Sequence, residues 1–450
     1  MIQWILAIRY LWKRRISLLA VASVALCVFI VVVVMTVMNG LVEEFRGKNH
    51  RFVGDCVVST ESLVGFVYAD EFLAILDRQD FIAGASPVIR GYGLLTQPGA
   101  EWNMGVEIWG LNLARHIQAT DFAQTLYYHP QNPTTAFVPS YNPSLPGCIL
   151  GIDMMPDRRN QDGTYYHPPQ PRQYELIVSG FPLTPKGGLA RIGTDLVNTL
   201  HVYLSDDSHS GLVKIDGRVV YLPFDTAREL FGMAGSIPRS SAIHIRFRPS
   251  VGLEAGCERV GRLWNEFKQS CRDREYADLL GEVRVQSWIE NRRGAIAPME
   301  KEQTMMIFLF LMLGVITVFI IFVVFYMIIS HKSKDIGVLR SVGVSPAGVV
   351  AMMLIFASLV GLIGGGLGIA GGSVFLARIN TLEDWLYETR GWQVWNRSVY
   401  AIGEIPNQIH PPVLIVIGLS ALAACWLGAL VPAFQAARKR PVEALQPGIL

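Results

Sequence analysis

The sequence predicts a membrane α-helical protein with four transmembrane helices and a large α+β extracytoplasmic domain inserted between helices 1 and 2. Three observations predict this class. The chain is 51% hydrophobic and only 17% charged, whereas soluble proteins carry about 25% charged residues. The apolar residues gather in four stretches that reach the roughly 20 residues needed to cross a bilayer. A long polar segment, residues 41–303, separates the first stretch from the second.

The four apolar stretches lie at residues 17–40, 304–330, 347–377 and 412–434. The first is longer than the 7–15-residue apolar core of a signal peptide and no A-x-A-like site follows it, so we expect an uncleaved anchor. The apolar cores contain no ionisable residue, and the spans therefore offer no relay for proton-coupled transport.

Lysine and arginine residues predict the orientation of the chain, because they are enriched on the cytoplasmic side. They cluster before the first stretch, between the second and third, and after the fourth. Both termini are therefore expected in the cytoplasm of a cell with an inner membrane. The predicted segments are a cytoplasmic N-terminal segment at 1–16, spans at 17–40, 304–330, 347–377 and 412–434, a periplasmic domain at 41–303, a cytoplasmic helix at 331–346, an extracytoplasmic loop at 378–411 and a cytoplasmic tail at 435–450.

Period-two alternation predicts strands in the polar segment, at residues 55–60, 82–97, 103–112, 172–183, 198–206, 218–233, 241–249 and 281–290. Helical spacing predicts helices at 68–79, 225–232 and 253–271. Because a strand–helix–strand order occurs at both ends, we expect the two ends to form one α+β subdomain that holds a β-rich centre. Residues 124–172, rich in proline, asparagine and tyrosine, are expected to be a loop or a weakly ordered insert.

Four of the six cysteines, Cys56, Cys148, Cys257 and Cys271, lie in the segment predicted to be exported. Disulfides persist outside the cytoplasm. Cys257 and Cys271 would close the shortest loop, but four cysteines allow three pairings, which stay open here. Cys27 and Cys425 lie in spans, where they are expected to act as small apolar residues.

No motif indicates catalysis. The sequence has no G-x-x-x-x-G-K-[ST] phosphate loop, no G-x-S-x-G elbow and no H-E-x-x-H helix. Asp206, Asp207 and His209 could be imagined as metal ligands, but a polar hairpin turn is the favoured interpretation. No basic run indicates a nucleic-acid partner. We therefore predict a chain that is not an enzyme and that binds no metal or cofactor of its own.

Glycines recur at four-residue spacing in the third stretch. Such small residues allow helix backbones to approach closely in lipid; a flexible or kinked helix is the alternative interpretation. The glycines are Gly361, Gly364, Gly365, Gly368 and Gly372.

A short amphipathic segment, "SHKSKDIGVLRSVGVSPAG" at 330–348, joins the second stretch to the third. Ile336, Leu339 and Val342 form an apolar stripe, and Gly343 is expected to end the helix. Ser345 and Pro346 suit the start of the next span. This spacing alone predicts only a short interfacial helix, of the kind that often lies on lipid.

The segment "KDIGVLRSVGVSP" and the tail "VPAFQAARKRPVEALQP" resemble FtsX-like permeases of the mechanotransmission class of ABC transporters. The segment "VVYLPFDTARELFGM" resembles part of that family's periplasmic domain. The start, "IRYLWKRR" followed by "VVVVMTVMNGLVEEFRGK", resembles the lipoprotein-releasing (Lol) permeases. The resemblance covers both membrane blocks, and it covers the polar segment only loosely. The insert at 124–172 departs from the family pattern, which leaves the carrier-binding surface and the cargo open.

The resemblance implies a permease that moves with a separate ATPase and releases lipoproteins from the inner membrane. Its partners would be two cytoplasmic ABC ATPase subunits holding ATP and Mg, a second permease copy that is identical or related, membrane lipid, and a periplasmic carrier or lipoprotein. It implies an ATPase-coupling helix made of Lys332, Lys334, Asp335, Ile336, Gly337, Leu339, Arg340 and Gly343.

For a lipoprotein cargo, the acyl chains are expected against Met35, Met38, Phe45, Met305 and Phe308; ordinary lipid-facing surface is the alternative for each. Two other functions stay open. One is efflux of a peptide, antibiotic or other amphiphile, as in macrolide exporters. The other is mechanical control of a cell-wall hydrolase, against which the size of segment 41–303 argues.

Overall fold

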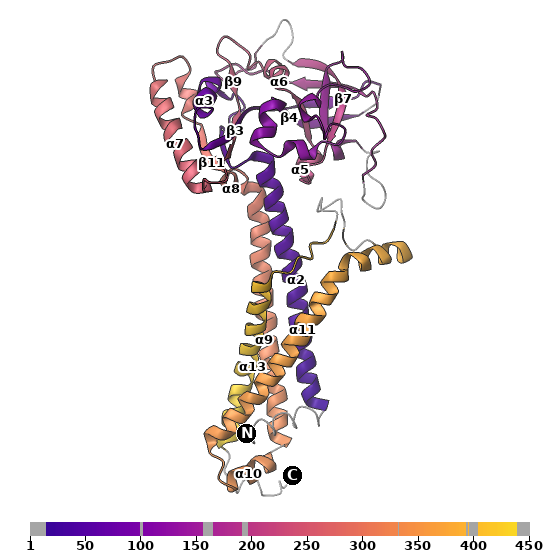
Figure 1. The fold of residues 1–450 in the computed structure, drawn as a ribbon, viewed down its shortest axis with the longest axis vertical. Coiled ribbons are helices and arrows are strands. Elements are labelled where there is room, and N and C mark those ends of the chain that lie inside the picture. Colours follow the sequence, from indigo (N-terminus) through magenta and orange to yellow (C-terminus); the bar gives the residue numbers. More distant parts are fainter. Residues whose placement is uncertain are drawn as a thin grey trace. The chain divides into compact units, whose positions relative to one another are not determined.

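A computed structural model of the protein forms two compact units (Figure 1). The first comprises Met1–Glu43, Pro298–Trp395 and Glu404–Leu450, and the second comprises Glu44–Ala297 and Asn396–Gly403. The residues that the structure describes are 15–99, 102–155, 165–190, 197–331, 333–392, 395 and 404–438.

The first unit is built from long apolar helices. They are α2 (Arg15–Val53), α9 (Arg293–His331), α11 (Pro346–Arg390) and α13 (Pro411–Arg438), joined in part by the short α10 (Ser333–Ser341). Each of the four long helices has the length and hydropathy to cross a membrane. Their packed side chains, among them Val24, Phe325, Val360 and Cys425, form one core.

Helix α11 is longer than predicted. It continues past residue 377 to Arg390, because no glycine or proline interrupts the chain until Gly391. Gly391 adopts φ 68°, a left-handed conformation that commonly ends helices. The predicted extracytoplasmic loop at 378–411 therefore begins as helix.

The second unit is a mixed α/β domain. Its large sheet has the strand order β11-β1-β10-β3-β4-β8-β5-β7-β6. The strands are β1 (Cys56–Ser59), β3 (Ile82–Thr96), β4 (Asn103–Leu111), β5 (Gly147–Gly151), β6 (Glu175–Gly180), β7 (Asn198–Ser208), β8 (Val219–Pro223), β10 (Ala242–Phe247) and β11 (Arg284–Ser287), with β2 (Phe66–Val67) and β9 (Arg239–Ser240) as a separate pair. Its helices are α3 (Ala69–Leu76), α4 (Leu113–Ala119), α5 (Val213–Asp216), α6 (Phe224–Leu230), α7 (Leu253–Ser270) and α8 (Trp288–Asn291), with short 3-10 turns at η1 (Phe122–Thr125), η2 (Pro133–Thr135), η3 (Ile152–Met154) and η5 (Ala277–Leu280).

Six strands of the sheet close into a ring. The long strand β3 pairs with β4 along its length and also with β6, so the pairing runs β3-β4-β8-β5-β7-β6 and back to β3. Pairs β4–β8 and β5–β7 are parallel, and the other pairs are antiparallel. Alternate side chains of these strands, including Leu95, Ile108 and Leu204, are buried in one core.

The two ends of the polar segment share a second core, as their repeated strand–helix–strand order predicts. Phe72 of α3, Ile243 of β10 and Trp264 of α7 are buried together with Val58 of β1. The rings of Phe72 and Trp264 meet edge to face, with centroids 4.8 Å apart. Helices α3 and α7 lie at one end of the unit and β7 at the other (Figure 1).

Two further predictions differ from the structure. Strand β5 lies inside the proline-rich stretch that was expected to be loop, and all its residues are buried between β7 and β8. Its apolar run Cys148–Leu150 is too short to stand out from the surrounding prolines and tyrosines. The strand predicted at 281–290 ends at Ser287, because Ser287 and Glu290 form a capping box that begins α8.

Two histidines lie in the interior of the second unit. His116 of α4 and His244 of β10 are fully buried, and their ring centroids are 5.5 Å apart. Burial lowers the pKa of His116 to about 3. Burial, together with the neighbouring His116, also lowers the pKa of His244. Both rings are therefore neutral in the folded protein at neutral pH.

These histidines predict a loss of stability in acid. A histidine in the unfolded chain has a pKa near 6.5. Below that pH the unfolded chain therefore binds more protons than the folded chain, and the free energy of unfolding falls. The fall is at most about 1.4 kcal/mol per pH unit for each histidine. For His116 this loss continues down to its folded pKa of about 3. We expect His116→Phe to weaken the pH dependence of the unfolding midpoint, measured by circular dichroism on the full chain between pH 7 and pH 5.

His201→Phe is the matched control, because His201 is exposed and pairs with Glu175 on the surface. The control should keep the pH dependence of the unmodified chain. Identical pH dependence in the chain and in both variants would contradict the buried neutral state of His116.

Candidate functional site

Glycines on α11 bring three helices of the first unit into close contact. A Cβ atom at Gly364 would lie 2.9 Å from Cβ of Val24, and one at Gly368 would lie 2.6 Å from the Ala25 carbonyl oxygen. Real Cβ atoms do not approach that closely, so only glycine permits this packing of α11 on α2. Gly372 continues the same contact toward Val32.

The other glycines of this face approach α13. A Cβ atom at Gly361 would lie 3.1 Å from Sγ of Cys425, and one at Gly365 would lie 4.0 Å from Cβ of Ala421. The five glycines of the predicted stripe are therefore divided between two neighbours: Gly364, Gly368 and Gly372 face α2, while Gly361 and Gly365 face α13.

Sequence reasoning missed the corresponding small residues of α13. A Cβ atom at Gly428 would lie 2.7 Å from the Val318 carbonyl oxygen of α9. The signal was available, because Ala421, Cys425 and Ala429 repeat every four residues. Trp426 adds a polar contact by donating a 2.8 Å hydrogen bond from Nε1 to Oγ of Ser358 on α11.

A groove of about 540 Å³ opens between α2, α9 and α13. Its lining is apolar apart from the side chains of Cys27, Thr317 and Ser420. The hydroxyls of Thr317 and Ser420 donate to carbonyls of their own helices, those of Leu313 and Ile417, at 2.9 and 2.8 Å. The groove therefore presents no unsatisfied hydroxyl donor, and it suits an apolar ligand.

The groove contains one of the five residues predicted to contact acyl chains. Met35 lines it, together with residues of α9 and α13 such as Leu311 and Leu427. Met305 and Phe308 are 67% and 65% exposed on α9 and do not line it. Met38 is half-buried and also lies outside the lining.

Phe45 lies in different surroundings from the other four. It belongs to the second unit, where it packs against a core that includes Phe52 and Trp109. Its neighbours are therefore those of a domain core.

The Met-Asn-Gly motif at residues 38–40 of α2, which ends the first predicted span, makes two specific contacts within the first unit. Asn39 accepts a 2.7 Å hydrogen bond at Oδ1 from Nε2 of Gln303 on α9. A Cβ atom at Gly40 would lie 2.5 Å from Cβ of Pro406. The motif thus joins α2 to α9 by an amide pair and leaves room for the chain that enters α13.

Helix α10 is anchored at two points. Ile336 is buried against Val349 of α11 and Ala433 of α13, and Gly337 beside it is buried as well. Arg340 donates a 2.9 Å hydrogen bond from Nη1 to the Ala437 carbonyl in the last turn of α13. A cation at that position also favours the helix dipole.

Helix α10 ends before Val342, the last residue of the predicted apolar stripe. Gly343 adopts φ 104°, and Ser345 caps α11 by accepting a 3.1 Å hydrogen bond from the Gly348 amide. Val342 lies beyond Ser341, the last residue of α10, and is 80% exposed, so it does not share a buried face with Ile336. Val338 is 49% exposed. Lys332 and the side chains of Lys334, Asp335 and Leu339 lie outside the described residues.

The predicted hairpin turn around Asp206 is wrong. Asp206 and Asp207 are buried at the end of β7, and Asp206 accepts hydrogen bonds from the backbone amides of Tyr127, Tyr128 and His129. A carboxylate that receives several amides serves as a local structural anchor. Among the described residues, no group of three or more His, Cys, Asp or Glu side chains is placed to hold a metal ion.

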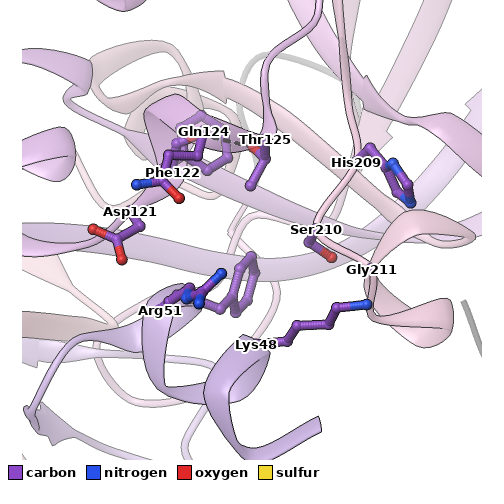
Figure 2. A pocket seen from close by; sticks show the side chains of 10 residues that line it. Lys48, Arg51, Asp121, Phe122, Gln124, Thr125, His209, Ser210 and Gly211 are labelled. Carbon is purple, nitrogen blue, oxygen red and sulfur yellow. Dashed lines mark hydrogen bonds between the residues drawn. The ribbon is translucent and has the colours of Figure 1, made fainter. Parts of the chain in front are cut away.

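A small polar pocket of about 190 Å³ lies next to this strand in the second unit (Figure 2). Arg51 of α2 and Asp121 lie across it from His209, and the Lys48 side chain extends toward Gly211 (Figure 2). Lys48 pairs with Glu44 at 3.1 Å, and Asp121 pairs with Arg246 at 2.7 Å. Two of the charged side chains that line the pocket are therefore paired within the second unit.

Residues 306–441, which include α10, α11, α13 and most of α9, match the family model described as FtsX-like permease C-terminal. This part of the chain is an FtsX-like permease domain. It contains the glycine-rich helix α11 and its neighbour α13, the α9 and α13 walls of the groove, and the anchored helix α10.

Similarity to known permeases extends beyond the FtsX-like domain. The lipoprotein-releasing system transmembrane protein LolC of Xylella fastidiosa is 23% identical over 449 residues, which covers 98% of both chains. The LolC protein of Neisseria meningitidis serogroup B is 21% identical over 458 residues, with the same coverage. Among solved structures, the periplasmic region of MacB from Actinobacillus actinomycetemcomitans matches 55% of this chain and 95% of its own length, at 11% identity and a TM-score of 0.30.

The close packing of α11 on α2 predicts a strong effect of bulk at Gly368. We expect Gly368→Leu to destabilise the helix bundle by about 1–3 kcal/mol, because the new side chain meets the Ala25 carbonyl and forces the helices apart. The measurement is the unfolding midpoint of the purified chain in detergent.

Gly366→Leu is the control, since it adds the same side chain to the same helix where no atom lies within 4 Å of the new Cβ. It should leave the midpoint close to that of the unmodified chain. Equal midpoints for the two variants would show that the glycine contact does not hold α11 to α2.

Proposed function

We propose that this chain is the permease subunit of an ATP-driven ABC transporter that releases lipoproteins from the inner membrane. The observation that carries the proposal is similarity over 98% of both chains to proteins named for lipoprotein release, combined with an FtsX-like domain at 306–441. The chain itself is not an enzyme in this proposal. ATP and Mg are bound by separate cytoplasmic ATPase subunits, two per transporter.

The apolar groove between α2, α9 and α13 is the proposed seat of the cargo's acyl chains. Its volume of about 540 Å³ and its internally bonded hydroxyls suit hydrocarbon. Moving an acyl chain out of lipid costs about 0.8 kcal/mol per CH₂. A groove that replaces lipid with protein side chains lowers this cost, and ATP binding by the partner supplies the remainder.

Helix α10 is the proposed contact for the ATPase. Its buried side, Ile336 and Arg340, is joined to α11 and α13, while Val338 and Val342 are exposed. A partner that pushes on the exposed residues therefore acts on two long helices at once. This division of labour differs from the sequence-based proposal, in which Arg340 itself contacts the ATPase.

Transmission to the second unit is proposed to run along α2 and α9. Each helix begins in one unit and ends in the other, since α2 spans Arg15–Val53 and α9 spans Arg293–His331. We further propose that both termini are cytoplasmic and that the second unit is periplasmic. A second permease copy, identical or related, completes the transporter, and a periplasmic carrier accepts the lipoprotein.

Filling the groove should block release. Gly314 lines the groove, and a Cβ atom added at this position would have no neighbour within 4 Å. Gly314→Trp therefore adds bulk to the groove without a clash at the Cβ atom. We expect at least a tenfold drop in ATP-dependent release of a triacylated lipoprotein from proteoliposomes that contain the permease and its ATPase.

Gly366→Trp is the matched control on α11, where a Cβ atom also has no neighbour within 4 Å and the position does not line the groove. It should release lipoprotein normally. Normal release by Gly314→Trp would contradict the groove as the acyl site. If Gly314→Trp stopped transport of a soluble amphiphile but not release of the lipoprotein, the result would favour efflux as the function.

Charges on the exposed side of α10 should separate the permease from its ATPase. We expect Val338→Glu combined with Val342→Glu to reduce co-purification of the ATPase at least tenfold, because both side chains are exposed and their replacement leaves the Ile336 and Arg340 contacts intact. Ala347→Glu, an exposed position in the first turn of α11, controls for added charge. Full recovery of the ATPase with the double variant would remove α10 as the coupling element.

A further inference from the structure

Two cysteines of the second unit face each other across the interface between α7 and the sheet. Helix α7 buries one face, which carries Val260, Trp264 and Phe267. Cys257 precedes Val260 by three residues and Trp264 by seven, so helical periodicity places it on that same face. It packs against the core to which these residues belong.

Strand β1 supplies the opposite wall. Cys56 and Val58 are fully buried in the α7 core, while Val57 between them belongs to the core on the other side of the sheet. This alternation points the Cys56 side chain toward α7. Cys56 lies between Ile245 of β10 and Ser287 of β11, which fix its position in the sheet.

The two thiols are neighbours in this core, because Cys56 is buried in it and Cys257 packs against it, and each thiol shifts the pKa of the other. The Cys257 thiol, together with burial, raises the pKa of Cys56. The neighbouring Cys56 thiol lowers the pKa of Cys257, which is partly exposed. Cys257 is therefore the more reactive and more accessible thiol of the pair.

Helix α7 excludes a disulfide between Cys257 and Cys271, the pair that would close the shortest loop. Cys257 lies in the first half of α7 and Cys271 is its C-cap residue. Fourteen residues of α-helix separate them by about 21 Å, whereas disulfide-bonded Cα atoms lie within about 7 Å. The remaining exported cysteine, Cys148, is fully buried in the separate core of the six-stranded ring.

We propose that Cys56 and Cys257 form a disulfide that joins β1 to α7. The oxidant is a disulfide compound. The Cys257 thiolate attacks one sulfur of that compound, forming a mixed disulfide and releasing one thiolate. Cys56 then loses its proton, and its thiolate attacks the Cys257 sulfur and releases the second thiolate. Two protein thiols are oxidised to one disulfide, and the disulfide compound is reduced to two thiols.

This cross-link has a defined structural consequence. Residues 56 and 257 are far apart in sequence, so the bond removes much of the freedom of the unfolded chain. It also fixes α7 to the strand that follows α2 in sequence. The proposal concerns a site that lipoprotein release does not require, and its chemistry can be tested without any transport activity.

The test uses the purified full chain in detergent, first reduced and then exposed to oxidised glutathione. After the remaining thiols are alkylated, peptide mass spectrometry should find the Cys56 peptide joined to the Cys257 peptide. The unfolding midpoint should be higher after oxidation. Cys271→Ser, which removes another buried cysteine of the same core, should form the same link.

Single variants separate the two roles. Cys56→Ser should retain glutathione on Cys257, because no second thiol displaces it, and Cys257→Ser should carry no glutathione at residue 56. A different pairing, or no pairing in the unmodified chain and in Cys271→Ser, would overturn the proposal. Glutathione retained at residue 56 of Cys257→Ser would overturn the assignment of the attacking thiol.

Discussion

The close approach of α11 to α2 and α13 is the constraint on which the first unit depends. Lipid chains are as apolar as leucine, so helices in a membrane gain little from hiding hydrophobic side chains and associate through tight packing. Here Gly364 and Gly368 allow α2 to contact α11 backbone to backbone, and Gly361 leaves room for the side chains of Leu422 and Cys425 on α13. Larger side chains at these positions would abolish the arrangement.

This packing also borders the groove. The α11 contact and the groove are adjacent, because Val24 and Val28 of α2 and Ala421 of α13 lie next to glycines of α11 and also line the groove. Helix α10 is attached to α11 and α13 through Ile336 and Arg340. A force on α10 therefore reaches α13, one wall of the groove, which connects the proposed ATPase contact with the proposed acyl site.

Much of this organisation could be predicted from the sequence, and the reasons are physical. The apolar helices, the glycine face and the cap at Ser345 follow from local rules of hydropathy, size and hydrogen bonding. Strand β5 could not be predicted, because its burial depends on distant partners in β7 and β8. The bond from Arg340 to Ala437 and the contact of Cys56 with Cys257 join residues far apart in sequence, and no local pattern reveals them. The sequence does not predict the groove itself: Met35, which lines it, is one of five candidate acyl contacts, and the α13 wall is not among them.

The central claim, that the groove receives the acyl chains of a lipoprotein, is tested most directly by photo-crosslinking. A photoreactive amino acid at Leu311, which lines the groove, should crosslink a triacylated lipoprotein in membranes that contain the ATPase. The same amino acid at Val374, which is exposed on α11 and lies outside the groove, should not. Equal crosslinking from both positions, or none from Leu311, would contradict the account.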